Sequence, residues 1–165
     1  MGYRPLFFFS LMLLFSGLLN ASDFEREQRL ASQIVDGIID GDAVFLKSNG
    51  HEFLSIYTRA DEPAGAVIIM HGRGYHPDWE DVAYPLRVGL AEQGWDTLSL
   101  QMPVLQKEAR YYDYIEIMDE AFPRIEAGID FLRQQRSQRI ILIAHSCLSL
   151  IHISEPARRN QSSRM

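Results

Sequence analysis

Arg139-Ile-Ile-Leu-Ile-Ala-His-Ser-Cys147 is the stretch of this 165-residue chain that best predicts its fold. Residues 140–143 form a short, continuous apolar run rich in β-branched side chains, which is typical of a parallel strand buried on both faces. The run leads directly into Ala144-His-Ser-Cys147, so a serine is expected on a sharp turn after a buried strand. In that position a serine is either a nucleophile or the N-cap of a following helix.

The chain upstream alternates between strand and helix patterns. A continuous apolar run predicts a strand at 66–70, and a further strand is expected at 95–100, before Met102-Pro103. Apolar residues at helical spacing predict helices at 81–93 and 111–133. Pro123 lies inside the last segment and is expected to kink or divide that helix. Alternating strands and helices imply a right-handed, mostly parallel α/β sheet in a single domain.

Two further elements precede this alternation. Ser22-Asp-Phe-Glu25 has the spacing of a capping box, which predicts an amphipathic helix that starts at Ser22 and ends by Gly41. Asn49-Gly50 separates two strand-like runs, 43–48 and 51–58, and supplies the positive φ angles that a type I′ turn needs. We therefore expect an N-terminal β-hairpin in the sheet.

Residues 1–21 are interpreted as a secretory signal peptide. Arg4 gives a positively charged start, residues 6–19 are apolar and rich in Phe and Leu, and small residues offer cleavage after Ala21 or after Ser22. The alternative is an uncleaved membrane anchor, although the apolar run is shorter than the about 20 residues that span a bilayer. The mature protein is expected in the periplasm or outside the cell, without a stable membrane span.

Residues 148–165 do not continue the α/β pattern. Leu148-Ser-Leu-Ile-His-Ile153 is the translation of the reverse complement of a common sequencing-transposon end. The adapter bases that usually follow encode Ser-Glu-Pro-Thr-Arg, from which only Ala157 departs. We interpret 148–165 as an artefactual tail, the alternative being a divergent natural C-terminus. Residues 22–147 would then be the N-terminal part of one domain.

Charge and cysteine content exclude several classes of function. The formal net charge is −6; the leader carries one positive charge and the tail a net two, so residues 22–147 carry −9. An acidic body argues against charge-driven binding of nucleic acid or anionic lipid. Cys147 is the only cysteine in the sequence, which excludes an intrachain disulfide. No histidine has zinc-ligand spacing, and we expect neither a metal nor a cofactor.

Two motifs follow buried strands, at the edge of the sheet where open α/β proteins bind ligands. His71-Gly-Arg-Gly74 follows the strand at 66–70. Such a loop, supported by His71, Gly72 and Gly74, can aim the N–H of Arg73 at a developing oxyanion, or it can be a tight turn that needs glycine only for its φ angle. In α/β-hydrolases the oxyanion loop follows a strand in the position that His71-Gly-Arg-Gly74 has here, and the nucleophile lies in the position of Ser146.

Ser146 is accordingly the candidate nucleophile. Cys147 competes as a thiol, but its place after the apex of the turn favours use of its backbone N–H, beside that of Arg73, in the oxyanion hole. His145 is adjacent to the serine and is not expected to be its base. His71 and His76 are interpreted as loop-packing residues, and Asp78 and Asp81 as residues that start a helix.

A longer motif carries a family resemblance. His71-Gly-Arg-Gly-Tyr-His-Pro-Asp-Trp79, followed by Gly94-Trp-Asp-Thr-Leu-Ser-Leu-Gln-Met-Pro-Val-Leu105, resembles a family of exported gammaproteobacterial proteins. That family has no assigned biochemical function and is grouped with the α/β-hydrolases. The resemblance covers about residues 64–147. It implies an α/β-hydrolase sheet with Ser146 at the nucleophile turn and Gly72-Arg73 in the oxyanion loop.

The predicted fold class is a truncated, α/β-hydrolase-like, mostly parallel sheet with an N-terminal hairpin. The predicted function is that of an exported serine esterase or acyl hydrolase that takes a small-molecule ester and binds no nucleic acid. This chain would be an inactive fragment of it, without the triad acid and histidine. The alternative is a non-catalytic periplasmic binding or envelope-accessory protein on the same fold. A third reading is a product that never folds, because its apolar sheet edge aggregates.

Overall fold

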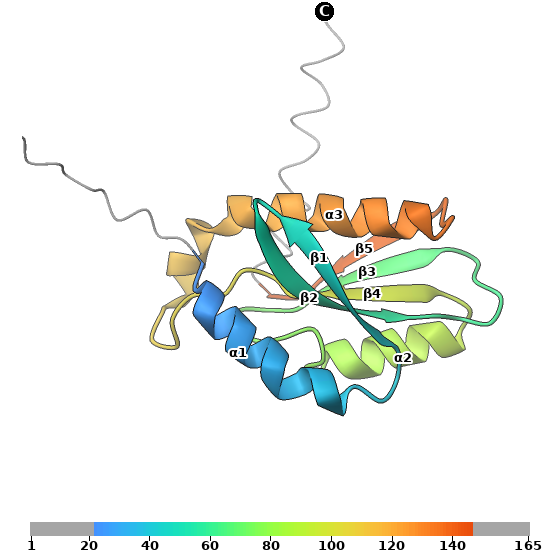
Figure 1. The fold of residues 1–165 in the computed structure, drawn as a ribbon, viewed down its shortest axis with the longest axis horizontal. Helices are drawn as coiled ribbons and strands as arrows, with labels where there is room; N and C mark the ends of the chain where they lie inside the picture. Colours follow the sequence, from blue (N-terminus) through green and yellow to red (C-terminus); the bar gives the residue numbers. More distant parts are fainter. Residues whose placement is uncertain (1–21, 147–165) are drawn as a thin grey trace, which may run out of the picture.

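The computed structural model describes residues 22–146, which form a five-stranded sheet with helices on both sides (Figure 1). The strands have the order β1-β2-β4-β3-β5 and these bounds: β1 Asp42–Ser48, β2 His51–Thr58, β3 Ala66–Met70, β4 Asp96–Leu100 and β5 Ile140–Ala144. The predicted signal peptide, the interpreted tail and Cys147 lie outside the described residues, so those predictions remain untested.

The strand directions confirm the predicted fold class. β3 pairs in parallel with β4 and β5, whereas β2 pairs antiparallel with both β4 and β1. Within residues 22–146, every strand except β2 therefore runs in one direction. The β1–β2 turn also has the predicted geometry, because Asn49 and Gly50 have φ angles of 49° and 81°.

The long helices α2 Ala83–Glu92 and α3 Ala121–Gln134 cover opposite faces of the sheet (Figure 1). On one face, Thr97 donates its hydroxyl hydrogen to the carbonyl of Arg87 in α2 over 3.1 Å. On the other, Gly128 of α3 approaches Leu100 and Ile68 so closely that a Cβ there would lie 3.1 Å from a Leu100 methyl carbon. The five residues of β3 are all buried, as their continuous apolar run predicted, and those of β4 are buried as well. The same prediction was wrong for β5, which lies at the end of the strand order and is only partly buried, with Ile141 exposed.

Two predicted helices differ from those observed. The segment predicted as one helix at 111–133 begins with two short 3₁₀ turns, η2 Tyr111–Ile115 and η3 Met118–Glu120, before α3 starts. Pro123 is the third residue of α3, in the first turn, where a backbone N–H has no partner within the helix. The proline therefore divides the segment rather than kinking a continuous helix.

The N-terminal helix α1 Phe24–Ile34 continues into a short 3₁₀ turn, η1 Val35–Gly37. Its cap is Asp23, whose carboxylate accepts the N–H of Arg26 at 2.9 Å. The prediction that Ser22 caps this helix was wrong, because the hydroxyl of Ser22 instead donates to the carboxylate of Glu120 at 2.6 Å. A contact between residues so far apart in the chain gives no local sequence signal.

Candidate active site

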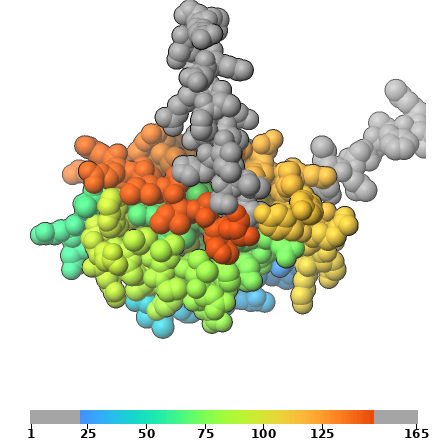
Figure 2. All heavy atoms as spheres, turned by 180° about the vertical axis from the view of Figure 1, so that it is seen from behind, coloured from blue at the N-terminus to red at the C-terminus, as the bar shows by residue number. Residues whose placement is uncertain are grey.

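Ser146 lies on a strained turn at the carboxyl end of β5. The N–H of His145 donates to the carbonyl of Met70 at 3.0 Å, so pairing with β3 continues one residue beyond β5. Ser146 then has a φ angle of 63°, in the left-handed region that side chains other than glycine rarely occupy. Such strain gathers at functional sites, and α/β-hydrolases hold their nucleophile on a sharp turn directly after a strand. Figure 2 shows the orange-red end of β5 at the surface of the molecule.

The loop after β3 forms a tight turn. The N–H of Tyr75 donates to the carbonyl of Gly72 at 3.4 Å, and Gly74, at the third position, has a φ angle of 75°. A positive φ angle at this position explains the second glycine of the motif. The side chain of Arg73 turns to the outside and donates to the carbonyl of Ala109 at 3.2 Å. Its backbone, and not its guanidinium, therefore belongs to the candidate oxyanion loop.

Gly72 brings the two motifs into contact. A Cβ on this glycine would lie 2.7 Å from Nδ1 of His145 and 3.1 Å from Cβ of Ser146, both inside ordinary contact distance. Gly72 is thus a close-approach glycine, while Gly74 is a turn glycine. The structure places the predicted loop against the predicted serine, whereas the catalytic roles of Ser146 and Arg73 remain predictions.

His71 holds this loop in place from inside the protein. Its side chain is 1% exposed, Nδ1 lies 2.7 Å from the carbonyl oxygen of Gly72, and Nε2 accepts the N–H of Met102 at 2.9 Å. Burial lowers the pKa of His71 to about 3. A neutral ring with its hydrogen on Nδ1 satisfies both contacts. His71 therefore ties the loop after β3 to the loop after β4, the packing role expected from the sequence, and is not placed to act as a base.

Aromatic side chains that the sequence did not single out flank the serine turn. The rings of Tyr75 and Trp79 stack with centroids 3.7 Å apart, and Trp79 also contacts the ring of His145 with centroids 5.4 Å apart. Tyr75 is exposed, so the stack reaches from the serine turn to solvent. Only the folded chain reveals it, because stacking depends on the path of the loop after β3.

A buried ion pair anchors the same loop and corrects the interpretation of Asp78. Arg87 of α2 is completely buried, and its Nη2 donates to the Asp78 carboxylate at 2.5 Å. It also donates to the hydroxyl of Thr58 at 3.0 Å and to the carbonyl of Asp40. Asp78 is thus an ion-pair partner of Arg87, and the prediction that Asp78 and Asp81 start a helix was wrong, because α2 begins at Ala83 with no acidic residue in its first turn. The pair fixes the loop to α2 and β2.

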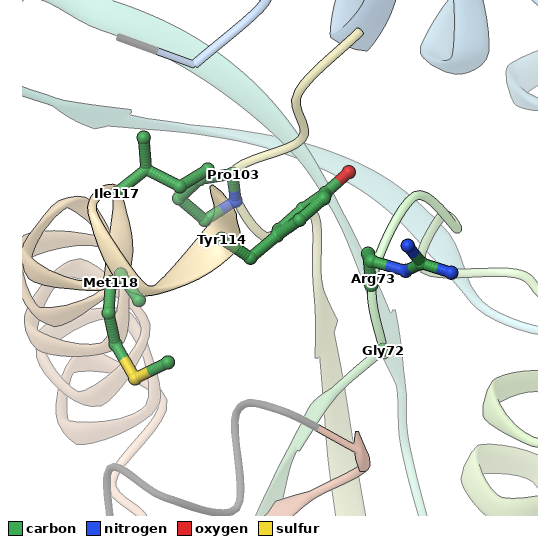
Figure 3. A pocket seen from close by; sticks show the side chains of 7 residues that line it. Gly72, Arg73, Pro103, Tyr114, Ile117 and Met118 are labelled. Carbon is green, nitrogen blue, oxygen red and sulfur yellow. The ribbon is translucent and has the colours of Figure 1, made fainter. Parts of the chain in front are cut away.

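A small, mainly apolar hollow adjoins the candidate oxyanion loop. Its walls come from the loops after β3 and β4 and from the start of α3, with these lining residues: Gly72, Arg73, Pro103, Tyr114, Ile117, Met118 and Ala121. Figure 3 shows the side chains of Pro103, Tyr114, Ile117 and Met118 together, while the Arg73 side chain points away from them. The hollow has a volume of about 10 Å³, which is room for about one water molecule.

Residues 22–146 contain no cluster of three histidine, cysteine or acidic side chains that could bind a metal ion. Nor do they contain a helix with the length and apolar character needed to cross a membrane.

Comparison with known proteins shows the fold and a family. The model of the family described as "Protein of unknown function (DUF3530)" matches residues 22–115. Among curated proteins, the arginine N-succinyltransferase of Enterobacter sp. (strain 638) is 30% identical over 115 residues, which cover 66% of this chain and 33% of that protein. The chain thus spans about a third of the length of this relative.

Among solved structures, the chain is similar to the Pyrococcus furiosus esterase Pf2001. Its crystal form in space group P21 gives a TM-score of 0.51 at 17% identity, covering 64% of this chain and 41% of the esterase. The P212121 form gives 0.50 at 18% identity, covering 66% and 41%. This similarity shows an α/β-hydrolase type of fold. The chain spans about two fifths of the length of the esterase.

Proposed function

The chain belongs to the DUF3530 family of proteins of unknown function, and from this premise we propose that it is the N-terminal part of an exported serine hydrolase that cleaves carboxylic esters. The observation that carries the proposal is the left-handed turn at Ser146, packed directly against Gly72. A strained serine after a parallel strand, touching a glycine loop that follows the neighbouring strand, is the local arrangement needed for acyl transfer. The fold of residues 22–146 supports it.

In the proposed reaction, the hydroxyl oxygen of Ser146 attacks the ester carbonyl carbon. The carbonyl oxygen gains negative charge and accepts hydrogen bonds from the N–H groups of Arg73 and Cys147, each donor being worth about 3 kcal/mol in such a site. A histidine takes the proton of Ser146 and gives it to the leaving alcohol, and an acid orients that histidine. Water then hydrolyses the acyl-enzyme by the same route.

We place the histidine and the acid in residues of a longer natural protein, in agreement with the interpretation of 148–165 as an artefactual tail. His71 is unsuited to the role of base, since both its ring nitrogens are engaged and its pKa is about 3. The chain as it stands is therefore expected to show no Ser146-dependent ester hydrolysis.

The hollow beside Gly72 suggests which part of the substrate it holds. Pro103, Ile117 and Met118 give it mainly apolar walls, and its volume, which is room for about one water molecule, admits a methyl-sized end of an acyl group and excludes a bulky ring. We propose a small-molecule ester with a short acyl group as the substrate class. The net charge of −9 on residues 22–147 disfavours nucleic acid as a partner.

Export rests on the leader. Residues 1–21 have the charged start, apolar centre and small-residue end of a signal peptide, which supports a periplasmic or secreted location.

A fluorophosphonate probe on the full-length natural protein tests the proposal. The probe should label the peptide that contains Ser146, and Ser146→Ala should abolish both the label and the hydrolysis of p-nitrophenyl acetate. Ser32→Ala is a matched control, because Ser32 is an exposed residue of α1. A folded full-length protein without label would instead favour the non-catalytic binding role.

A further inference from the structure

Ser22, the first residue that the structure describes, is held by Glu120. Its backbone N–H donates to Oε1 of Glu120 at 3.2 Å, and its hydroxyl donates to Oε2 at 2.6 Å. Ser22 is 5% exposed, although it follows the segment interpreted as a leader. The next residue, Asp23, donates its N–H to the carbonyl of Val104 at 2.7 Å and caps α1. The fold therefore encloses the backbone from Ser22 onward.

The surroundings of this nitrogen are rich in negative charge. Glu27 and Arg124 form a buried ion pair with a shortest distance of 2.8 Å, which uses the positive charge of Arg124. Glu120 adds a second carboxylate nearby and contributes to the raised pKa of Glu27, whose main cause is burial. Within residues 22–146, no lysine or arginine forms an ion pair with Glu120. A positive charge on the Ser22 nitrogen would offset the charge of the Glu120 carboxylate that it contacts.

We propose that the leader is cut between Ala21 and Ser22, and that the α-ammonium group of the new N-terminus forms an ion pair with Glu120. A signal peptidase would hydrolyse this peptide bond: the hydroxyl of water adds to the carbonyl carbon of Ala21, and the nitrogen of Ser22 leaves as an amine. Near neutral pH the amine takes up a proton from solution, so a neutral amide donor becomes a cation. The inference rests on the proposed export but not on the proposed catalysis.

The two hydrogen bonds of Ser22 favour one of the two cleavage sites that the sequence left open. Cleavage after Ser22 would remove the residue that makes both hydrogen bonds with Glu120. Cleavage after Ala21 keeps both and adds a charge.

The ion pair would also stiffen a wall of the hollow beside Gly72. Glu120 ends η3, and its N–H donates to the carbonyl of Ile117 at 3.0 Å. Ile117, Met118 and Ala121 all line the hollow.

The first test is the N-terminus of the exported chain. The full 165-residue precursor is produced in a bacterial host, and the chain from the periplasm is examined by intact mass and N-terminal sequencing. A chain that starts at Ser22 is the expected result. A start at Asp23 or at any other residue would overturn this inference while leaving export intact, and an uncut precursor would overturn both export and this inference.

The second test measures the pH at which the α-amine of the same mature protein loses its proton. The protein is acetylated at a series of pH values, and the extent of acetylation is read from its N-terminal peptide. Glu120 contacts this nitrogen directly, Asp23 is the next residue along the chain, and the Glu27–Arg124 ion pair lies near Glu120. In the Glu120→Gln variant the midpoint should fall by about one pH unit, because a contacting carboxylate favours the protonated amine. The amine is buried to the same extent in the unchanged protein and in Glu120→Gln. The difference between their two midpoints therefore measures the effect of the Glu120 charge.

Glu126→Gln is the matched control, since Glu126 is an exposed carboxylate of α3, and its midpoint should equal that of the unchanged protein. If Glu120→Gln does not fold, a mature chain that retains Ala21 provides the same comparison. Its α-amine then belongs to Ala21, one residue before the Ser22 nitrogen that contacts Glu120. Equal midpoints in the unchanged protein and in either altered chain would overturn the ion pair.

Discussion

Gly72→Ala should destabilise the protein by steric conflict with the serine turn. The added carbon would lie 2.7 Å from Nδ1 of His145 and 3.1 Å from Cβ of Ser146, where ordinary contacts start near 3.4 Å. His145 is exposed and can turn aside, but Ser146 is fixed by a turn with a φ angle of 63°. Overpacking of this degree costs about 1–3 kcal/mol of the free energy of unfolding.

Gly89→Ala is the matched control for this change. Gly89 lies inside α2, and a Cβ there would meet no atom within 4 Å. The same added carbon should therefore stabilise the protein by about 0.5–1 kcal/mol, the usual gain of alanine over glycine inside a helix. The two substitutions share their chemistry and differ only in their surroundings.

Urea unfolding followed by circular dichroism measures both effects, with the unchanged chain run alongside. We expect the Gly72→Ala midpoint to fall and the Gly89→Ala midpoint to rise. Equal midpoints for the two variants, or a stabilised Gly72→Ala, would refute the contact between the loop after β3 and the serine turn.

Three other predictions concern the ion pair, a buried histidine and the source sequence. Arg87→Met should lower the free energy of unfolding, measured in urea, by about 3–5 kcal/mol, because it leaves the mostly buried Asp78 without its ion-pair partner. Arg133→Met, which removes a surface ion pair, should lower it by less than about 1 kcal/mol. His71 has a pKa of about 3 when folded and an ordinary pKa near 6.5 when unfolded, so below pH 6.5 the unfolded chain binds a proton that the folded chain does not. The free energy of unfolding should fall by up to about 1.4 kcal/mol per pH unit from pH 6.5 toward pH 3, with no such slope above pH 6.5. The slope should be smaller in a folded His71→Asn variant, where His76, whose pKa burial also lowers, still contributes, and equal slopes in the two proteins would contradict this. Long-read sequencing of the source locus should show the frame continuing past codon 147 into further strands; a genome that encodes 148–165 as given would remove the basis for the tail as an artefact.

The elements whose signal is local could be predicted from the sequence. The apolar run of β3 and the Asn49-Gly50 turn depend on neighbouring residues alone, and both occur at the predicted places. The contact between the two motifs also followed, because parallel strands bring their carboxyl ends to one edge of a sheet. The pattern did not show that Gly72 permits a close contact while Gly74 forms the turn. The contact of Gly72 is with Ser146, 74 positions later in the chain, and no local pattern contains it.

The buried polar contacts could not be predicted in the same way. Arg87 and Asp78 look like surface charges in the sequence, and only the packing of α2 on the sheet buries them. Ser22 resembled a helix cap because its spacing to Glu25 fits that role, yet the carboxylate of Glu120 competes for its hydroxyl. Such pairings depend on the path of the whole chain, which a local pattern does not contain.

Fluorophosphonate labelling of the full-length natural protein, followed by peptide mass analysis, tests whether the Ser146 turn holds a nucleophile. We expect one labelled peptide, which contains Ser146, and no label on the 165-residue chain under the same conditions. A folded full-length protein that stays unlabelled, or that is labelled at another serine, would contradict it.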